Sequence, residues 1–167
     1  MATQTVHDLE AKSDAAWKNL KAQLAGMEPY LERADAPGEW TAREVLSHLM
    51  FGGTWKPAAL LASFAERDLP TIEIEPGDTF LTPERCRMPL AQFVTALETQ
   101  RRETFEYLRT LSDADLGRKA RIPLFKSFMG TDEIPLPMFV GALYDHHLND
   151  HAGQLAKIRK AVGLPAV

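Results

Sequence analysis

The sequence predicts an all-α protein, a four-helix bundle with a long crossover between its second and third helices. Two observations support this prediction. Apolar side chains recur at steps of three and four residues along four long segments, which is the spacing of one helix face. A stretch from Asp68 to Pro89, with four prolines and little periodicity, separates the second segment from the third. A bundle is the simplest architecture for four long amphipathic helices with one long connection.

The first two predicted helices have clear boundary signals. The first covers about residues 5–33, and we expect Pro29 to end or kink it. The second begins with a capping box, in which Thr41 accepts a hydrogen bond from the Glu44 amide while the Glu44 side chain reaches back. It continues to about Phe64, with a kink rather than a break at 52–57, where Gly52, Gly53 and Pro57 fall.

The rest of the chain supplies the crossover and the other two helices. Residues 71–75 alternate in polarity but are too few and too isolated to make a sheet, and we expect a helical turn after Pro83. The third helix covers about 89–111, and a short capped turn follows at 112–115. Residues 121–130 are irregular. The fourth helix covers about 135–162, where glycine and proline then stop it.

The composition is typical of a globular protein. The 167 residues suit one domain, and 45% of them are hydrophobic. A net charge of −4 with dispersed lysine and arginine argues against a nucleic-acid partner. A single cysteine, Cys86, excludes an internal disulfide, and no segment has the ~20 apolar residues of a membrane span. We therefore expect a cytoplasmic protein without a membrane partner.

The histidines form the candidate functional site. His147 and His151 are four residues apart on the apolar stripe of the fourth helix, so both rings can face one ion. Such a pair alone is weak evidence, but burying two unpaired imidazoles would be costly. His48, near a core-facing edge of the second helix, adds a third ligand. Three imidazoles would leave open positions on a divalent metal, which is the pattern of catalytic rather than structural sites.

Other residues near these histidines are weaker candidates. Asp150 and Gln154 lie within a turn of the ligands and could fix a ring tautomer, although for Asp150 exposure to solvent is an equal alternative. His146 is expected on the surface and His7 to be uninvolved. No Glu-x-x-His, HExxH, CxxC, GxGxxG or P-loop motif occurs, so carboxylate-bridged di-iron, zincin, dinucleotide and nucleotide sites are unsupported.

Two segments resemble a known family. The segment Trp40-Thr-Ala-Arg-Glu-Val-Leu-Ser-His48-Leu resembles the start of the second helix in DinB-like proteins. The segment His147-Leu-Asn-Asp-His151-Ala-Gly-Gln154-Leu resembles their final-helix signature, HxxxHxGQ. The resemblance spans nearly the whole chain. It implies a four-helix bundle of the DinB/YfiT type, one Zn or Ni ion held by His48, His147 and His151, and a homodimer.

The resemblance does not settle one reaction, because related proteins include transferases and isomerases that use bacillithiol, mycothiol or glutathione. The first hypothesis is a metal-dependent thiol S-transferase acting on a small electrophile. Trp55, Tyr144 and Phe51 could line its pocket, and Arg101 could face an acidic thiol, although core packing or a surface position also explains these residues. The alternatives are a metal-dependent hydrolase and a non-enzymatic metal-binding bundle of the stress response.

Overall fold

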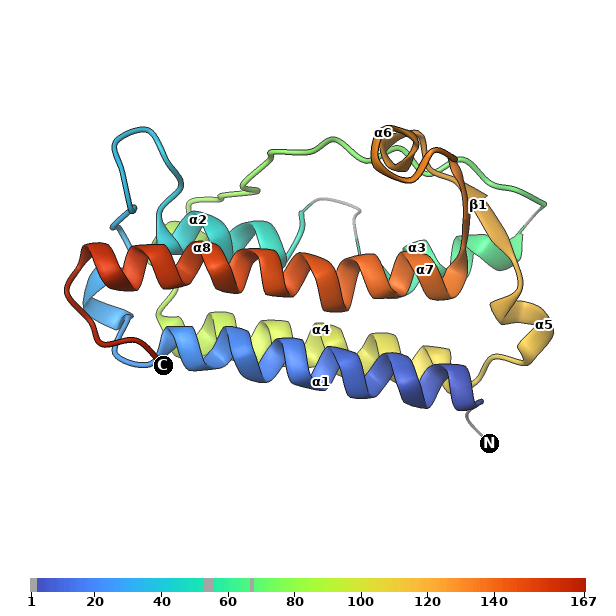
Figure 1. The fold of residues 1–167 in the computed structure, drawn as a ribbon, viewed down its shortest axis with the longest axis horizontal. Coiled ribbons are helices and arrows are strands. Elements are labelled where there is room, and N and C mark those ends of the chain that lie inside the picture. The colour runs from blue at the N-terminus through green and yellow to red at the C-terminus, as the bar shows by residue number, and fades with distance from the viewer. Residues whose placement is uncertain (1–2, 53–55, 67) are drawn as a thin grey trace.

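The computed structural model describes residues 3–52, 56–66 and 68–167. Figure 1 shows the long helices lying side by side, which confirms the predicted bundle. The helices and strands, in chain order, are α1 (Gln4–Leu24), η1 (Glu28–Tyr30), α2 (Ala42–Leu49), α3 (Pro57–Glu66), η2 (Arg85–Arg87), α4 (Leu90–Leu108), α5 (Asp113–Leu116), β1 (Lys119–Arg121), η3 (Pro123–Phe125), α6 (Lys126–Met129), β2 (Glu133–Pro135), α7 (Leu136–Gly141), η4 (Ala142–His146) and α8 (His147–Ala161).

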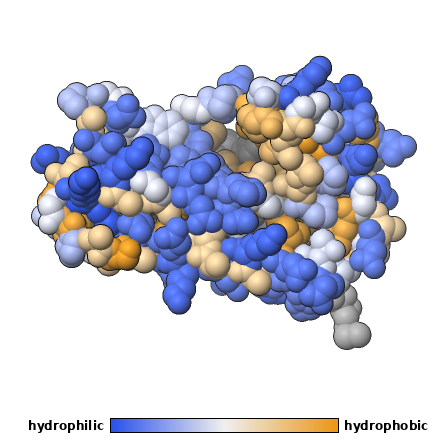
Figure 2. Space-filling model, in the orientation of Figure 1, coloured by the Kyte–Doolittle hydropathy of each residue, from blue (hydrophilic) through white to orange (hydrophobic). Residues whose placement is uncertain are grey.

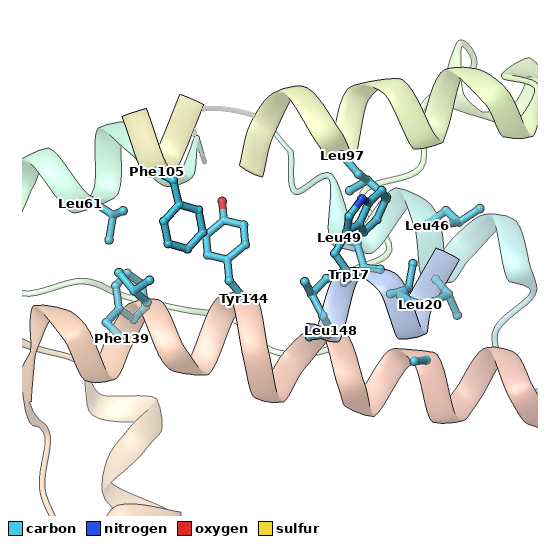
Figure 3. Close-up of a cluster of buried hydrophobic side chains, with 14 of the residues drawn as sticks. Trp17, Leu20, Leu46, Leu49, Leu61, Leu97, Phe105, Phe139, Tyr144 and Leu148 are labelled. Atoms are coloured by element: carbon cyan, nitrogen blue, oxygen red, sulfur yellow. The ribbon is translucent and has the colours of Figure 1, made fainter. Parts of the chain in front are cut away.

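The core lies between the long helices. α1 packs along the continuous helix formed by α7, η4 and α8, while α4 packs against α3 and α2 packs against α8. Leu20, Leu46 and Phe105 are among the side chains that fill the interior, each at most 1% exposed (Figure 3). The apolar periodicity of the sequence therefore marks the faces that the helices bury.

The predicted second helix is two helices, so the expectation of a kink rather than a break was wrong. α2 ends at Leu49, and Phe51 has a φ of 57°, in the left-handed region that a continuing helix cannot use. α3 begins at Pro57, which lacks an amide proton to bond back to the preceding turn. Figure 1 shows the crossover, 68–89, passing back over α3 and α2.

A small antiparallel sheet, formed by β1 and β2, was not predicted, and the expectation that 121–130 is irregular was wrong in part, because this stretch contains η3 and α6. Lys119 pairs with Pro135 and Arg121 with Glu133. The segment at 71–75 forms no strand, as expected, and contacts the sheet through one isolated bridge between Thr71 and Arg121, where the Ile72 amide donates to the Arg121 carbonyl at 2.8 Å. Strands of three residues carry too little alternation to be recognised, and long-range pairing forms them.

The remaining boundaries follow local signals. α1 ends at Leu24, earlier than predicted, because Gly26 takes a φ of 74° that stops the helix before Pro29. The turns expected after Pro83 and at 112–115 are η2 and α5. Three apolar side chains near the small sheet are exposed: Phe128, Met129 and Met138. Figure 2 shows an apolar area where Figure 1 places α6.

Candidate metal centre

The first of the three histidines is held by the short helix α2. The predicted capping box is present: the Glu44 amide donates to Thr41 Oγ1 at 3.2 Å, and the Thr41 amide donates to Glu44 Oε2 at 2.7 Å. This arrangement satisfies two amides at the start of the helix and explains the presence of Glu44 without a catalytic role. His48 then lies in the last turn of α2, beside the point where the chain leaves the helix.

The other two histidines lie at the start of α8, directly after a π-helical turn. The turn, η4, is a single wide turn inside an otherwise α-helical segment. Such bulges often occur at functional sites, because the extra residue changes the direction of the side chains that follow. His147 and His151 follow the bulge one α-helical turn apart, and both project toward α2.

The three imidazoles converge through the same ring nitrogen. His147 Nε2 lies 2.9 Å from His48 Nε2 and 3.1 Å from His151 Nε2. The three residues form a group whose possible ligand atoms all lie within 4.8 Å of one another, so the cluster could hold a metal ion. Tetrahedral zinc with Zn–N bonds of 2.0–2.1 Å places neighbouring nitrogens about 3.3 Å apart, only a few tenths of an ångström more than these separations.

Hydrogen bonds on the far side of two rings set their tautomers. His48 Nδ1–H donates to the Asp78 carbonyl at 2.6 Å, and His151 Nδ1–H donates to Gln154 Oε1 at 2.9 Å. In a neutral ring, a proton on Nδ1 leaves a lone pair on Nε2, so both Nε2 lone pairs face His147. A proton on His147 Nε2 could form a hydrogen bond with only one of these two lone pairs, whereas a metal cation could bind an Nε2 lone pair from each of the three rings. The donor set therefore fits a divalent metal.

Burial keeps the three rings in the neutral form that metals bind. Removal from water lowers the pKa of His147 to about 3, with smaller contributions from the neighbouring rings of His151 and His48. Burial also lowers the pKa of His48 and of His151, although hydrogen bonds to Asp78 and Gln154 oppose the shift. At neutral pH all three imidazoles are therefore neutral, each with one ring nitrogen free of a proton and available as a ligand.

Each histidine ring has an aromatic neighbour. Trp40 is parallel to His151, with ring centroids 6.2 Å apart, and Phe51 stacks on His147 at 6.1 Å. Phe80 stacks on His48, also at 6.1 Å. Sequence reasoning considered Phe51 for the pocket but assigned no role to Trp40 or Phe80. Phe80 belongs to the crossover, whose course over α2 no periodic pattern indicates.

The crossover supplies a wall of the site. Asp78 not only accepts from His48 through its carbonyl; its carboxylate also accepts the Phe80 amide at 2.7 Å. Phe80 has a φ of 53°, and its ring lies so close to Gly52 that a Cβ there would approach the ring to 2.7 Å. Left-handed backbone at a residue other than glycine costs energy and often occurs at functional sites. Sequence reasoning missed Asp78 entirely.

The other predicted site residues are distributed unevenly around the histidines. Gln154 lies at hydrogen-bond distance from His151, as described above. Asp150 is exposed, and its negative charge raises the pKa of His151 slightly against the larger effect of burial. Trp55 lies outside the described residues. His146 and His7 are exposed, as expected.

Tyr144 and Arg101 lie on the inner side of His147. They line a cavity of about 10 Å³ that also contacts His147 and Phe51, with room for about one water molecule. Tyr144 is buried beside Phe105 (Figure 3), its hydroxyl is 2.8 Å from Thr104 Oγ1, and burial raises the pKa of the phenol. Arg101 pairs with Asp14, while its buried Nε has no hydrogen-bond partner among the described residues. The cavity is too small for an electrophilic substrate in this conformation.

Comparisons with known proteins identify the family and the fold. Residues 7–155 match the sequence model of the DinB superfamily. No curated protein matches the chain. No helix in the described part of the chain is long and apolar enough to cross a membrane.

Two solved structures share the fold. YfiT from Bacillus subtilis, described as a probable metal-dependent hydrolase with an unusual four-helix bundle topology, is 19% identical with a TM-score of 0.72, over 99% of this chain and 91% of YfiT. A histidine-to-alanine mutant of mycothiol-dependent maleylpyruvate isomerase is 14% identical with a TM-score of 0.56, over 96% of this chain and 69% of the isomerase. At these identities the likeness establishes the fold and not the reaction.

Proposed function

We propose that this chain, which belongs to the DinB superfamily, is a metal-dependent thiol S-transferase whose single divalent ion, Zn or Ni, is held by His48, His147 and His151. The observation that carries the proposal is the convergence of three Nε2 atoms, with Nδ1–H of two rings engaged by Asp78 and Gln154. Three protein ligands leave room on the ion for an exchangeable molecule.

The surroundings of the site favour a thiol over water as that molecule. A divalent ion held there would acidify whichever molecule takes its open positions, a thiol in a transferase or water in a hydrolase. A hydrolase usually also needs a carboxylate or histidine as general base. Among the described residues, Asp150 is exposed without a hydrogen bond to a ligand, the Asp78 carboxylate accepts the Phe80 amide, and Glu44 caps α2.

A thiol needs less from the protein. Its proton can leave to water, its sulfur then donates an electron pair to an electrophilic carbon, and the leaving group departs with the electrons of the broken bond. The rings of Trp40, Phe51 and Phe80 lie against the histidines and give the site apolar walls. Bacillithiol, mycothiol and glutathione are the candidate thiols. A hydrolase is the second candidate, supported by the description of YfiT.

Metal content and thiol binding test the proposal together. The wild-type protein should bind about one Zn, Ni or Co ion per chain after treatment with chelator and reconstitution, and the matched control His146→Ala should do the same, because His146 is exposed. With Co bound, one of the three thiols should perturb the visible spectrum and react with a model electrophile such as a chlorodinitrobenzene. If His147→Ala still binds one metal, the site assignment is wrong.

The same experiments separate the alternatives. A Co spectrum that no thiol changes would contradict the transferase and leave hydrolysis, to be assayed with ester and amide substrates. A metal that raises the melting temperature strongly but supports neither reaction would indicate a structural metal in a non-enzymatic bundle. The homodimer and the single domain stay predictions, which sedimentation and limited proteolysis would test.

A further inference from the structure

The ring of His48 is oriented by the crossover rather than by its own helix. Its Nδ1–H donates to the carbonyl of Asp78, thirty residues along the chain, at 2.6 Å. For His151 the corresponding acceptor is Gln154, only three residues away on the same helix. The position of the Asp78 carbonyl depends on how the crossover is attached to α2. The groups that make this attachment therefore control one of the three metal ligands.

One side chain joins the crossover to the residue next to His48. Arg85 Nη1 donates to the Ser47 carbonyl at 3.0 Å, to Ser47 Oγ at 3.2 Å and to the Phe80 carbonyl at 3.1 Å. Ser47 precedes His48 in α2 and is fully buried, and Phe80 is two residues from Asp78. A single guanidinium nitrogen thus spans the two segments whose separation sets the hydrogen bond between His48 and Asp78.

Arg85 is itself held by a second arginine. Arg43, which is 8% exposed on α2, donates through Nη1 to the carbonyl of Arg85 at 2.9 Å and to that of Met88 at 2.6 Å. Burial lowers the pKa of the Arg85 guanidinium, which still remains charged at neutral pH. Removing a cation from water is costly, and the three acceptors of Arg85, two on Ser47 and one on Phe80, offset part of that cost.

We propose that Arg85 is a positioning residue for the metal centre: by tying Phe80 to Ser47 it holds the Asp78 carbonyl against His48 Nδ1 and so presents His48 Nε2 to the metal. The inference rests on the metal site of the proposed function but not on thiol chemistry. An arginine with a merely structural role would affect the stability of the bundle without selectively changing the tautomer of His48 or the affinity for metal.

The variant Arg85→Gln tests the proposal, with Arg87→Gln as a matched control, since Arg87 is exposed on the same short helix η2. Zn and Co affinities are measured at a temperature where circular dichroism shows both proteins fully folded. We expect Arg85→Gln to bind about 10- to 100-fold more weakly, the usual effect of losing an outer partner of a ligand, and Arg87→Gln to stay within about twofold of wild type.

A second measurement needs no metal. Ring ¹⁵N shifts of the metal-free wild type should show His48 with its proton on Nδ1, whereas Arg85→Gln should show a mixture of tautomers. Arg85→Lys keeps the charge but not the planar guanidinium, so its share of the Nδ1–H tautomer of His48 should lie between those of wild type and Arg85→Gln. This variant replaces Arg85→Gln in both measurements if Arg85→Gln does not fold. Unchanged tautomer and affinity would overturn the inference, even if the melting temperature falls. If wild type binds no metal, the proposed function fails, while the tautomer measurement still decides the role of Arg85.

Discussion

His151 and His48 reach the same centre by different routes, and the contrast shows how the site is built. His151 has its acceptor, Gln154, one helical turn away, so α8 alone sets the pair. His48 has its acceptor in the crossover, and the contact exists only because 78–85 folds back over α2. One half of the site is therefore local and robust, and the other depends on long-range packing.

The largest expected loss of metal affinity comes from replacing His147, which contacts the ligands of both halves. His147 lies between His48 and His151, so His147→Ala should lower metal affinity by more than about 100-fold, beyond the loss of an outer partner. Isothermal titration with Zn is the measurement, and the exposed neighbour His146→Ala is the control. Similar affinities in the two variants would mean that the metal lies elsewhere.

Acid should weaken both halves at once in the metal-free protein. Burial lowers the pKa of the three histidines, that of His147 to about 3, so the folded state resists protonation more than the unfolded chain does. The unfolded rings take up protons near pH 6.5, and stability should fall from about that pH down toward 3. Urea unfolding between pH 8 and 4 measures this, and a flat profile would contradict it.

Disturbing the long-range half should have the next largest effect. A Cβ added at Gly52 would lie 2.7 to 3.0 Å from the Phe80 ring, so Gly52→Ala should push the crossover away from His48. We expect metal affinity to fall about 10- to 100-fold, as for other losses of an outer partner. Adding Phe80→Gly to Gly52→Ala should relieve the clash, because it removes the ring and also the Phe80 Cβ, which the added methyl would approach to 2.9 Å. If affinity does not change in Gly52→Ala, the crossover does not control the site.

Disturbing the local half should have a smaller effect. Gln154→Ala removes the acceptor of His151 Nδ1–H but leaves the helix intact, so metal affinity should fall by about 10-fold. Gln154→Glu keeps an acceptor and should retain or increase the affinity. A Gln154→Ala variant that loses more affinity than Gly52→Ala would reverse the order proposed for the two halves.

The smallest effect is a control within α8. Gly153 is exposed, and a Cβ there meets nothing within 4 Å, so Gly153→Ala should raise stability by about 0.5–1 kcal/mol through helix propensity. Metal affinity should stay within twofold. Thermal unfolding measures the stability and titration measures the metal affinity. A clear loss of affinity would show that the half of the site on α8 is not robust to small changes.

Features that depend on neighbours along one helix could be predicted from the amino-acid sequence. Helical periodicity predicted the bundle, the pair Thr41 and Glu44 predicted the start of α2, and spacings of four and three residues placed His147, His151 and Gln154 on one helix. These features were predictable because an α-helix has 3.6 residues per turn, so the spacing of two residues in the sequence gives their relative positions on the helix.

The other features of the site and the fold could not be predicted in this way. The break before α3, the small sheet, the carbonyl of Asp78 over His48 and the bridge made by Arg85 all join segments separated by many residues or lie in irregular backbone. A backbone carbonyl has no side-chain signature, and a proline-rich crossover has no period that gives its course. Those contacts follow from how the whole chain packs, because hydrogen bonds between distant segments depend on the positions of both partners.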